Sequence, residues 1–260
     1  MPKVKVRELW RFPVKSLQGE RVDSLDVGPV GAAGDRRYSL ADPVTGKLLS
    51  AKREARLFEA SARTVDGEVF IDLPDGTEIA AASPDVTGAL SSWLGRDVAF
   101  LEVGDGVDHV YDMTLDPPND EAEYYDIPTP TGTFVDLAAL HVITTSSLAA
   151  MAAAGPQLDW NIRRFRPNVV VDGAEDGFAE DSWVHREVSL GPDLRLLPFM
   201  RTMRCAMPLR AQPGLDRQVD TFRVMQDAHS NDLGVYCSVV AAGRVEVGAV
   251  VEIGGEAPDT

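Results

Sequence analysis

Alternation of apolar and polar side chains is the dominant pattern in the first half of the chain. Residues 4–12 follow the two-residue period of a half-buried strand, and Pro13 ends the run. Further short apolar runs at residues 22–27, 69–71 and 78–80 are separated by turn-forming residues at intervals of roughly 8–12 residues. This spacing is typical of a sandwich or barrel, so we predict that the first half is mostly β.

One segment of the first half has helical spacing instead. Apolar residues between positions 86 and 94 form a stripe, Ser83 and Pro84 are typical of a helix start, and Gly95 is typical of a helix end. We therefore predict one helix here, with Ser83 as its N-cap, packed against the β-structure.

An acid-rich stretch divides the chain. Residues 104–126 contain eight Asp or Glu residues, no Lys or Arg, and two consecutive prolines. Such a composition favours a surface loop over a buried element. We predict a first domain at residues 1–103, an acidic connecting loop at residues 104–126 and a second domain at residues 127–260.

The second half opens with a pattern of strands followed by a helix. Residues 134–136 and 140–143 are apolar runs of strand length, and residues 148–154 follow as a helix. At the helix start, the hydroxyls of Thr144 and Ser147 accompany free backbone N–H groups, a combination that attracts anions. These two residues are candidate anion ligands, and plain N-capping by one of the hydroxyls is the alternative.

The rest of the chain again has the pattern of strands. An apolar, β-branched run at residues 169–171 follows Arg164 and Arg166, and a hairpin at residues 187–197 leads towards Cys205. Three further apolar runs occupy residues 234–240, 243–248 and 250–253. We therefore predict a mainly β chain with a few helices, an α+β fold.

Composition narrows the classes of function. The 260 residues include 25 Lys and Arg against 41 Asp and Glu, a formal net charge of −16. An acidic chain repels phosphate backbones, so we expect no nucleic acid as the main partner. The N-terminus lacks an apolar signal region, and no apolar run approaches the roughly 20 residues of a membrane span. We expect a soluble, cytoplasmic protein without a membrane partner.

Positive charge is concentrated in a few places. No Lys or Arg occurs between residues 97 and 162. Basic residues gather instead at Lys15 and at residues 36–37, 52–53, 163–166 and 201–223. If these clusters meet in space, they form a site for an anionic ligand, with Lys15 and Ser16 as donors. The alternative is that they are solvated surface side chains.

The two cysteines suggest a further kind of chemistry. Cys205 and Cys237 cannot form a disulfide framework, and they cannot supply the four thiolates of an iron–sulfur cluster. Arginines at positions 201 and 204 lie beside Cys205, and positive charge favours the thiolate, the form that binds a soft metal. Cys205 is therefore the candidate metal ligand, and any iron–sulfur electron donor must be a separate protein. His141, on an apolar strand, is expected to be a core histidine.

Taken in order, the motifs resemble those of the MOSC superfamily, which is named after the C-terminal domain of molybdenum-cofactor sulfurase. The resemblance covers nearly the whole chain and implies an N-terminal MOSC β-barrel domain followed by a MOSC β-barrel domain. In the first domain it rests on the segments Phe12–Leu17, Gly34–Tyr38 and Ser50–Arg53. In the second it rests on Asp136, Thr144–Leu148, Phe165–Asn168, Phe178–Trp183, Arg204–Cys205, Gly234–Tyr236 and Val245–Gly248.

Within that superfamily the chain is most similar to the amidoxime-reducing enzymes and their bacterial relatives, which bind molybdopterin between the two domains. The resemblance implies that Cys205 supplies a thiolate to molybdenum and that Asp136 lies near the metal in a proton-transfer role. It also implies that the pterin and its phosphate are held by Lys15, Ser16, Arg36, Arg166 and Asn168. The implied activity is the reduction of N-hydroxylated or related N- or S-oxygenated small molecules, with electrons from an external flavin or iron–sulfur partner.

The chain departs from the family pattern around the candidate metal ligand. The family often has a second cysteine three residues before the ligand, and this chain has Thr202 at that position. The family also has a Thr-Thr-Val-Asp-Pro type of segment after the ligand, which residues 206–210 replace in this chain. Substrate choice is therefore left open. Two alternatives to the enzyme also stay open: a carrier of the cofactor or of a persulfide on Cys205 in cofactor maturation, and a scaffold that binds no cofactor. A pyridoxal-phosphate domain does not fit in the first 130 residues, so we expect no pyridoxal phosphate.

Overall fold

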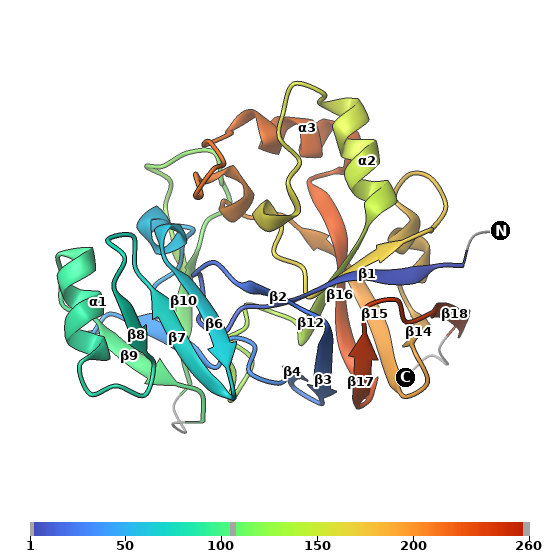
Figure 1. Cartoon of the computed structure of the whole chain (residues 1–260). Helices are drawn as coiled ribbons and strands as arrows, with labels where there is room; N and C mark the ends of the chain where they lie inside the picture. Colours follow the sequence, from blue (N-terminus) through green and yellow to red (C-terminus); the bar gives the residue numbers. More distant parts are fainter. Residues whose placement is uncertain (1–2, 105–107, 257–260) are drawn as a thin grey trace.

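The structure is a computed structural model and describes residues 3–104 and 108–256. Across these residues strands predominate and three α-helices are present, so the prediction of a mainly β fold with a few helices is confirmed. The N-terminal half, with α1, and the C-terminal half, with α2 and α3, lie side by side (Figure 1).

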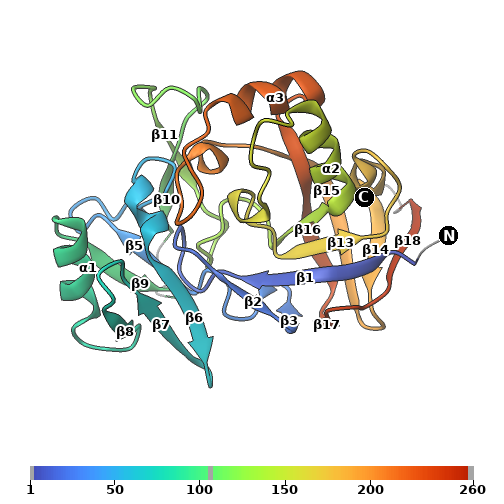
Figure 2. The ribbon, with the colours of Figure 1, turned by 45° about the horizontal axis from the view of Figure 1, so that its top comes forward.

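The largest element is an eight-stranded sheet with the order β18-β14-β15-β16-β12-β13-β1-β2. Its strands are β1 Lys5–Arg11, β2 Glu20–Val22, β12 Leu140–Thr144, β13 Val169–Asp172, β14 Arg186–Leu190, β15 Leu194–Met203, β16 Asp232–Ala241 and β18 Val251–Glu256. Only the β12–β13 pair in this sheet is parallel. The first strand of the chain therefore lies in the sheet of the C-terminal half, alongside β13 (Figure 2).

The large sheet curls back on itself without closing into a barrel. Val6 N donates to Ala249 O at 2.9 Å, and Val251 N donates to Val4 O at 2.9 Å. These bonds link the beginning of β1 to the residues around the start of β18. They form an isolated bridge, and β1 and β18 are not paired as neighbouring strands of the sheet. No sheet closes into a barrel in the part of the chain that the structure describes. The physical reason is that β1 pairs along its length with β13 and β2, so only its first residues reach the other edge.

The N-terminal half consists of smaller sheets. These are β5 Tyr38–Ala41 with β9 Ala99–Glu102, the meander of β6 Ser61–Val65, β7 Glu68–Asp72 and β8 Glu78–Ala80, and β3 Ser24–Gly28 with β4 Gly31–Ala32 and β17 Gly243–Glu246. Helix α1, Val86–Leu94, covers the core of this half, and Gly95 ends it in the left-handed conformation as predicted. The N-cap of α1 is Asp85 and not Ser83. Ser83 instead begins a turn before the helix, in which its backbone carbonyl accepts from Val86 N at 3.2 Å.

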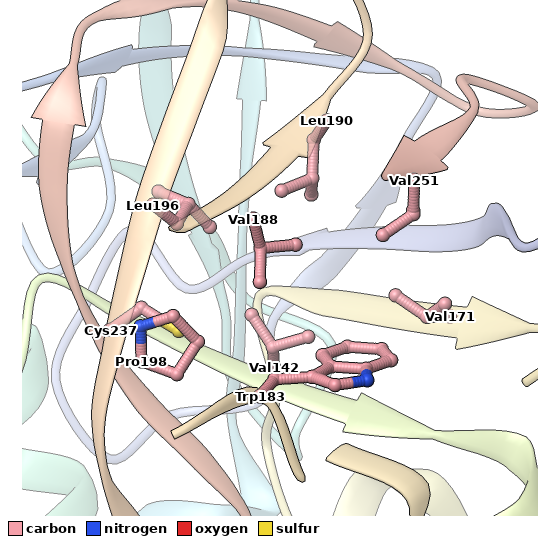
Figure 3. A pocket seen from close by; sticks show the side chains of 9 residues that line it. All are labelled: Val142, Val171, Trp183, Val188, Leu190, Leu196, Pro198, Cys237 and Val251. Atoms are coloured by element: carbon pink, nitrogen blue, oxygen red, sulfur yellow. The ribbon is translucent and has the colours of Figure 1, made fainter. Parts of the chain in front are cut away.

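A tightly packed apolar core fills the inside of the curled sheet. Val142, Trp183, Val188 and Cys237 converge there from different strands and from the turn before β14 (Figure 3). Cys237 has no exposed surface, and burial raises the pKa of its thiol, so this cysteine stays a neutral, structural side chain.

Two helices cover the outer face of the large sheet. Helix α2, Thr145–Ala154, and helix α3, Asp220–His229, lie next to each other (Figures 1 and 2). Met151 of α2 and Met225 of α3 pack with Ile143 of the sheet in one core cluster. Helix α2 was predicted; α3 was not, because its largely polar sequence has no glycine or proline at its ends.

Two predicted segments differ from the structure. The predicted acidic loop, residues 104–126, contains β10, Val110–Met113, and the start of β11, Tyr125–Pro128, which pair with each other. Lys47 contacts both Asp112 and Asp126, so neighbouring cations neutralise the acids of these strands. The division into domains at these positions stays a prediction.

The second difference concerns residues 134–136, which do not form the predicted strand. Their backbone carbonyls instead accept from side chains: Phe134 O from Lys15 Nζ at 2.7 Å, and Asp136 O from the Tyr111 hydroxyl at 3.1 Å. Separately, no helix among the described residues has the length and apolar character needed to cross a membrane.

Candidate functional site

A cavity of about 220 Å³ lies where the N-terminal half meets the curled sheet. Its wall is built from segments far apart in the chain, including the turn after β1, the loop before β12 and the residues that follow β15. The volume is just below the roughly 300 Å³ at which typical small-molecule pockets begin. The residues predicted for the site that line it are Lys15, Ser16, Arg36, Asp136, Arg166, Asn168 and Cys205.

Cys205 is the thiol that a ligand in this cavity can reach. It lies between the end of β15 and the short 3-10 helix η4, Met207–Leu209. Its side chain is free and half-buried, and it packs on one side against the apolar core of the N-terminal half. The other cysteine, Cys237, is sealed in the core described above, so the two thiols have different roles.

Arg204, next to Cys205, is buried and has no acidic partner among the residues that the structure describes. It is 7% exposed and lines the cavity. Its Nη2 donates to Phe165 O at 2.9 Å, whereas its buried Nε has no hydrogen-bond partner within the described chain. A buried donor without a partner costs roughly 1–3 kcal/mol, and more when it is charged. This arrangement therefore favours a bound anion that accepts from Arg204.

Arg166 is a second buried cation in the wall, and it too forms no salt bridge within the part of the chain described. Its Nη1 donates to Leu17 O at 2.7 Å, and its guanidinium lies 4.1 Å from the centre of the Phe12 ring. Burial, and then the positive charge of Arg36, lower the pKa of Arg166 to about 9. A negative ligand would relieve both effects, because it would offset the lost hydration and the repulsion between the arginines.

Backbone strain is concentrated at this cavity. Ser16, Arg36 and Arg166 have φ angles of 69°, 45° and 53°. Non-glycine residues in this region cost roughly 1–3 kcal/mol each and persist only where the surrounding structure holds them. Arg36, for example, is held by its N–H, which donates to Phe12 O at 2.7 Å. Three such residues on one wall are the pattern expected of a binding site.

Arg36 and Asn168 are positioned by other parts of the protein. Arg36 Nη1 contacts the buried Asp35 carboxylate and lies 3.4 Å from Asn168 Oδ1. Asn168 also accepts from His141 N at 3.3 Å and donates to Trp10 O at 3.4 Å. Asn168 thus joins β1, β12 and the arginine, and it orients Arg36 as well as lining the cavity.

Asp136 is held between two lysines. Lys15 Nζ binds one carboxylate oxygen, and Lys52 Nζ binds the other at 2.7 Å. Burial opposes the ionised form, but the two ammonium groups outweigh it and hold the pKa of Asp136 well below its usual range. Asp136 is therefore a carboxylate at neutral pH, and the three side chains together carry a net charge of +1.

His141 lines the cavity as a neutral side chain. Burial and then the charge of Arg204 lower its pKa well below the usual value. Its Nε2 lies 3.3 Å from Leu233 O. A Cβ atom on the neighbouring Gly234, whose φ is +85°, would lie 2.3 Å from Nε2 of His141. The close approach of these strands therefore requires glycine at position 234.

The structure separates Thr144 and Ser147 from this cavity, which corrects the prediction that they bind the same ligand. Both side chains are fully buried, and their hydroxyls donate to Glu180 Oε2 at 2.5 and 2.6 Å. Thr144 also caps helix α2 by accepting from Ser147 N. The carboxyl group of Glu180 thus occupies the N-terminus of helix α2, where it accepts from Thr144 N at 3.3 Å, and burial raises its pKa.

Several residues of the cavity wall were not among the predicted site residues. They are Lys52, Tyr111, Arg204 and Tyr236, together with the apolar side chains Met113, Ile127, Leu137, Met200 and Met203. Two signals were available for Lys52 and Arg204: both stand in segments that carry the family resemblance, and both belong to the basic clusters noted in the sequence. Leu137, Met200 and Met203 are partly exposed, at 49%, 37% and 57%, and so form an apolar rim.

The segment after Cys205 is anchored by two buried arginines. Arg164, which is fully buried, donates to Pro208 O at 3.2 Å and to Asp216 O at 2.8 Å. Arg210 Nε donates to Lys52 O at 3.2 Å. The segment that departs from the family pattern is thus tied to the segment that carries Lys52.

Comparisons with known families match both halves of the chain. The model of the MOSC N-terminal beta barrel domain matches residues 3–115, and the model of the MOSC domain matches residues 130–252. None of the curated proteins matches the chain.

Three bacterial proteins are among the solved structures to which the chain is similar. The YuaD protein of Bacillus subtilis is 14% identical with a TM-score of 0.49, and the match covers 97% of this chain and 96% of that one. YiiM of Escherichia coli is 18% identical with a TM-score of 0.34, covering 59% of this chain and 66% of that one. YiiM of Geobacillus stearothermophilus is 10% identical with a TM-score of 0.34, covering 58% and 73%.

Proposed function

Because the chain belongs to the MOSC superfamily and carries both its N-terminal beta barrel domain and its MOSC domain, we propose that it is a molybdenum-cofactor-binding oxidoreductase. MOSC domains are associated in general with molybdopterin binding. The finer proposal concerns this chain: it reduces N-hydroxylated or related N- or S-oxygenated small molecules, and its electrons come from a separate flavin or iron–sulfur protein.

One observation carries the proposal. A half-buried free thiol, Cys205, shares a cavity with two buried arginines, Arg204 and Arg166, that form no salt bridge within the described residues. The unpartnered Nε of Arg204 points to an acceptor that residues 3–104 and 108–256 do not supply. A thiol for a soft metal beside donors for an oxyanion is the set that a metal complex of a phosphorylated pterin needs.

The residues of the cavity fit this group. Cys205 would supply the thiolate ligand of molybdenum. Lys15, Ser16, Arg36, Arg166 and Asn168 would hold the pterin and its phosphate, and Arg204, which was not predicted, joins them. When bound, the cofactor supplies two-electron oxygen-transfer chemistry, which side chains alone cannot perform.

The chain itself supplies binding, orientation and the exclusion of water. The cations are pre-positioned by strained backbone at Ser16, Arg36 and Arg166, so little further ordering is needed when an anion binds. The apolar rim of Leu137, Met200 and Met203 surrounds a polar interior and would accept the apolar body of a substrate whose oxygenated end enters the cavity.

Metal analysis tests the proposal. We expect about one molybdenum per chain in protein made in a host that synthesises the cofactor, and little in the Cys205→Ala variant. Cys237→Ala is the matched control, because it removes the other thiol from a dry core without touching the cavity, and it should keep the metal. Reduction of an N-hydroxylated base with an artificial electron donor should follow the molybdenum content.

The alternative function has its own readout in the same samples. A carrier would hold labile sulfur on Cys205 and little molybdenum. Such a result would replace the oxidoreductase with a role in cofactor maturation. If the wild type holds neither molybdenum nor labile sulfur, the result would favour a scaffold.

A further inference from the structure

Reduction of an N-oxygenated compound needs protons as well as electrons, and the cavity holds few groups that can give one. In the proposed function, on which this inference rests, the N–O bond of an N–OH group breaks. The external flavin or iron–sulfur donor supplies two electrons, and two protons are consumed, one on nitrogen, which solvent water supplies, and one on the oxygen that leaves as water. The acid nearest to the leaving oxygen must be protonated near neutral pH and able to release its proton.

Asp136, the residue predicted for proton transfer, has no proton to give. Both of its carboxylate oxygens accept from ammonium groups, one from Lys15 and the other from Lys52. These two charges stabilise the carboxylate so strongly that its ionised form persists through the whole physiological range.

Lys15 has the geometry of a donor. Two of the three N–H groups of its ammonium are directed to Asp136 and to Phe134 O, the latter at 2.7 Å. The residue is 5% exposed and forms part of the cavity wall. Lys52 is more enclosed, at 1% exposed, with its Nζ 4.0 Å from the centre of the Tyr111 ring.

The tyrosines of the wall are weaker acids than Lys15. The hydroxyl of Tyr111 donates to Asp136 O at 3.1 Å, and burial raises its pKa. Burial also raises the pKa of Tyr236 to about 12. Both therefore hold their protons firmly at neutral pH.

The surroundings of Lys15 make its proton available. The charged and titratable groups that face it are Asp136, Lys52, Arg36 and Tyr111. Burial, and then Lys52 and Arg36, outweigh the attraction of Asp136 and lower the pKa of Lys15 to about 8. An acid in this range is mostly protonated at pH 7 and releases its proton readily, which is the condition for general acid catalysis.

We propose that Lys15, besides its proposed part in holding the cofactor, is the acid that protonates the leaving oxygen of the substrate, and that Asp136 is a positioning residue which holds the ammonium of Lys15 at the cavity wall. The Lys15 N–H bond breaks as the oxygen–hydrogen bond forms, which leaves a neutral amine. Water at the cavity mouth then returns the proton to this amine. Lys52 holds the second oxygen of Asp136 and so fixes the carboxylate.

The first test titrates the lysine ammonium groups of the full chain by ¹H–¹⁵N NMR without bound cofactor. We expect one lysine, absent from the spectrum of Lys15→Arg, to titrate near pH 8. Asp136→Asn should move this titration to lower pH because it removes the attracting charge. Lys52→Gln should move it to higher pH because it removes a repelling charge. Opposite shifts require that both groups act on Lys15, and a normal lysine titration near pH 10.5 would overturn the proposal.

The second test uses the cofactor-loaded protein. Turnover should fall at high pH because the ammonium is lost, and this basic limb should lie above the titration of the cofactor-free protein because a bound anion raises the pKa of Lys15. The limb should shift in the same opposite directions in Asp136→Asn and Lys52→Gln. Lys15→Arg keeps the charge but holds its proton too tightly, so it should keep its molybdenum and lose roughly 100-fold or more in kcat.

The two proposals fail in different ways. If the wild type binds no molybdenum, the proposed function fails whatever the titration of Lys15. If Lys15→Arg binds molybdenum and turns over at the wild-type rate, the function stands and the role of Lys15 is refuted. An Asp136→Asn variant that binds metal, lacks all turnover and leaves the Lys15 titration unchanged would return the proton-donor role to Asp136.

Discussion

Replacing Gly234 by alanine tests whether the close approach of β16 to β12 shapes the wall of the cavity. Gly234 has a φ of +85°, and an added Cβ would lie 2.3 Å from His141 Nε2 and 2.7 Å from Val142 O. The carbonyl belongs to a strand paired on both sides, so it cannot move without disturbing the sheet. The imidazole of His141 must therefore shift, and the side of the cavity that it lines shifts with it.

The expected cost has two parts. An alanine in the left-handed region costs roughly 1–2 kcal/mol. Overpacking in a core adds typically about 1–3 kcal/mol. The variant Gly76→Ala distinguishes the cost of the backbone conformation from the cost of overpacking. Gly76 has a similar φ of +87°, but an added Cβ there would meet nothing within 4 Å. We expect Gly76→Ala to lose about 1–2 kcal/mol and Gly234→Ala about 2–5 kcal/mol.

Urea denaturation followed by circular dichroism measures both free energies of unfolding. The excess loss in Gly234→Ala over Gly76→Ala reports the steric clash alone. We also expect Gly234→Ala to lower the molybdenum content of loaded protein, whereas Gly76→Ala leaves it unchanged. Equal losses of stability in the two variants would refute the reasoning, because the contact with β12 would then carry no cost.

Three further predictions concern single side chains. Arg204→Met removes a buried cation that has no acidic partner in the described part of the chain, so its free energy of unfolding in urea should stay equal or rise while its molybdenum content falls. Full metal loading of this variant would contradict the role of Arg204. Glu180→Gln weakens the acceptor shared by the hydroxyls of Thr144 and Ser147, so the free energy of unfolding should fall by about 1–3 kcal/mol. A loss of molybdenum from the folded variant would instead indicate that Thr144 and Ser147 help to bind the cofactor. A thiol reagent should modify one cysteine per native chain and two in denaturant, and the loss of the native reaction in Cys205→Ala but not in Cys237→Ala should identify the reactive group.

Much of the fold was predictable from local patterns. The two-residue alternation of residues 4–12 corresponds to β1, and the glycine at position 95 ends helix α1 as expected. Pairing between distant strands was not predictable in this way. No local signal indicates that β1 lies against β13, more than 150 residues later, or that the large sheet stays open.

The candidate site was predicted as far as residue type and family resemblance allow. The grouping of Lys15, Arg36, Arg166 and Cys205 around one cavity agrees with the expectation that the basic clusters meet in space. Their roles stay predictions. Which side chain pairs with which could not be read from the chain, because Glu180 at α2 and Lys52 at Asp136 come from segments remote in sequence.

The most direct test is a crystal structure of the cofactor-loaded protein with data collected at the molybdenum absorption edge. We predict a single strong metal peak in the cavity, within bonding distance of the Cys205 sulfur, and an oxygen of the cofactor accepting from Nε of Arg204. A metal peak elsewhere, or a cavity in which Cys205 binds no metal while the protein still reduces its substrate, would contradict the account.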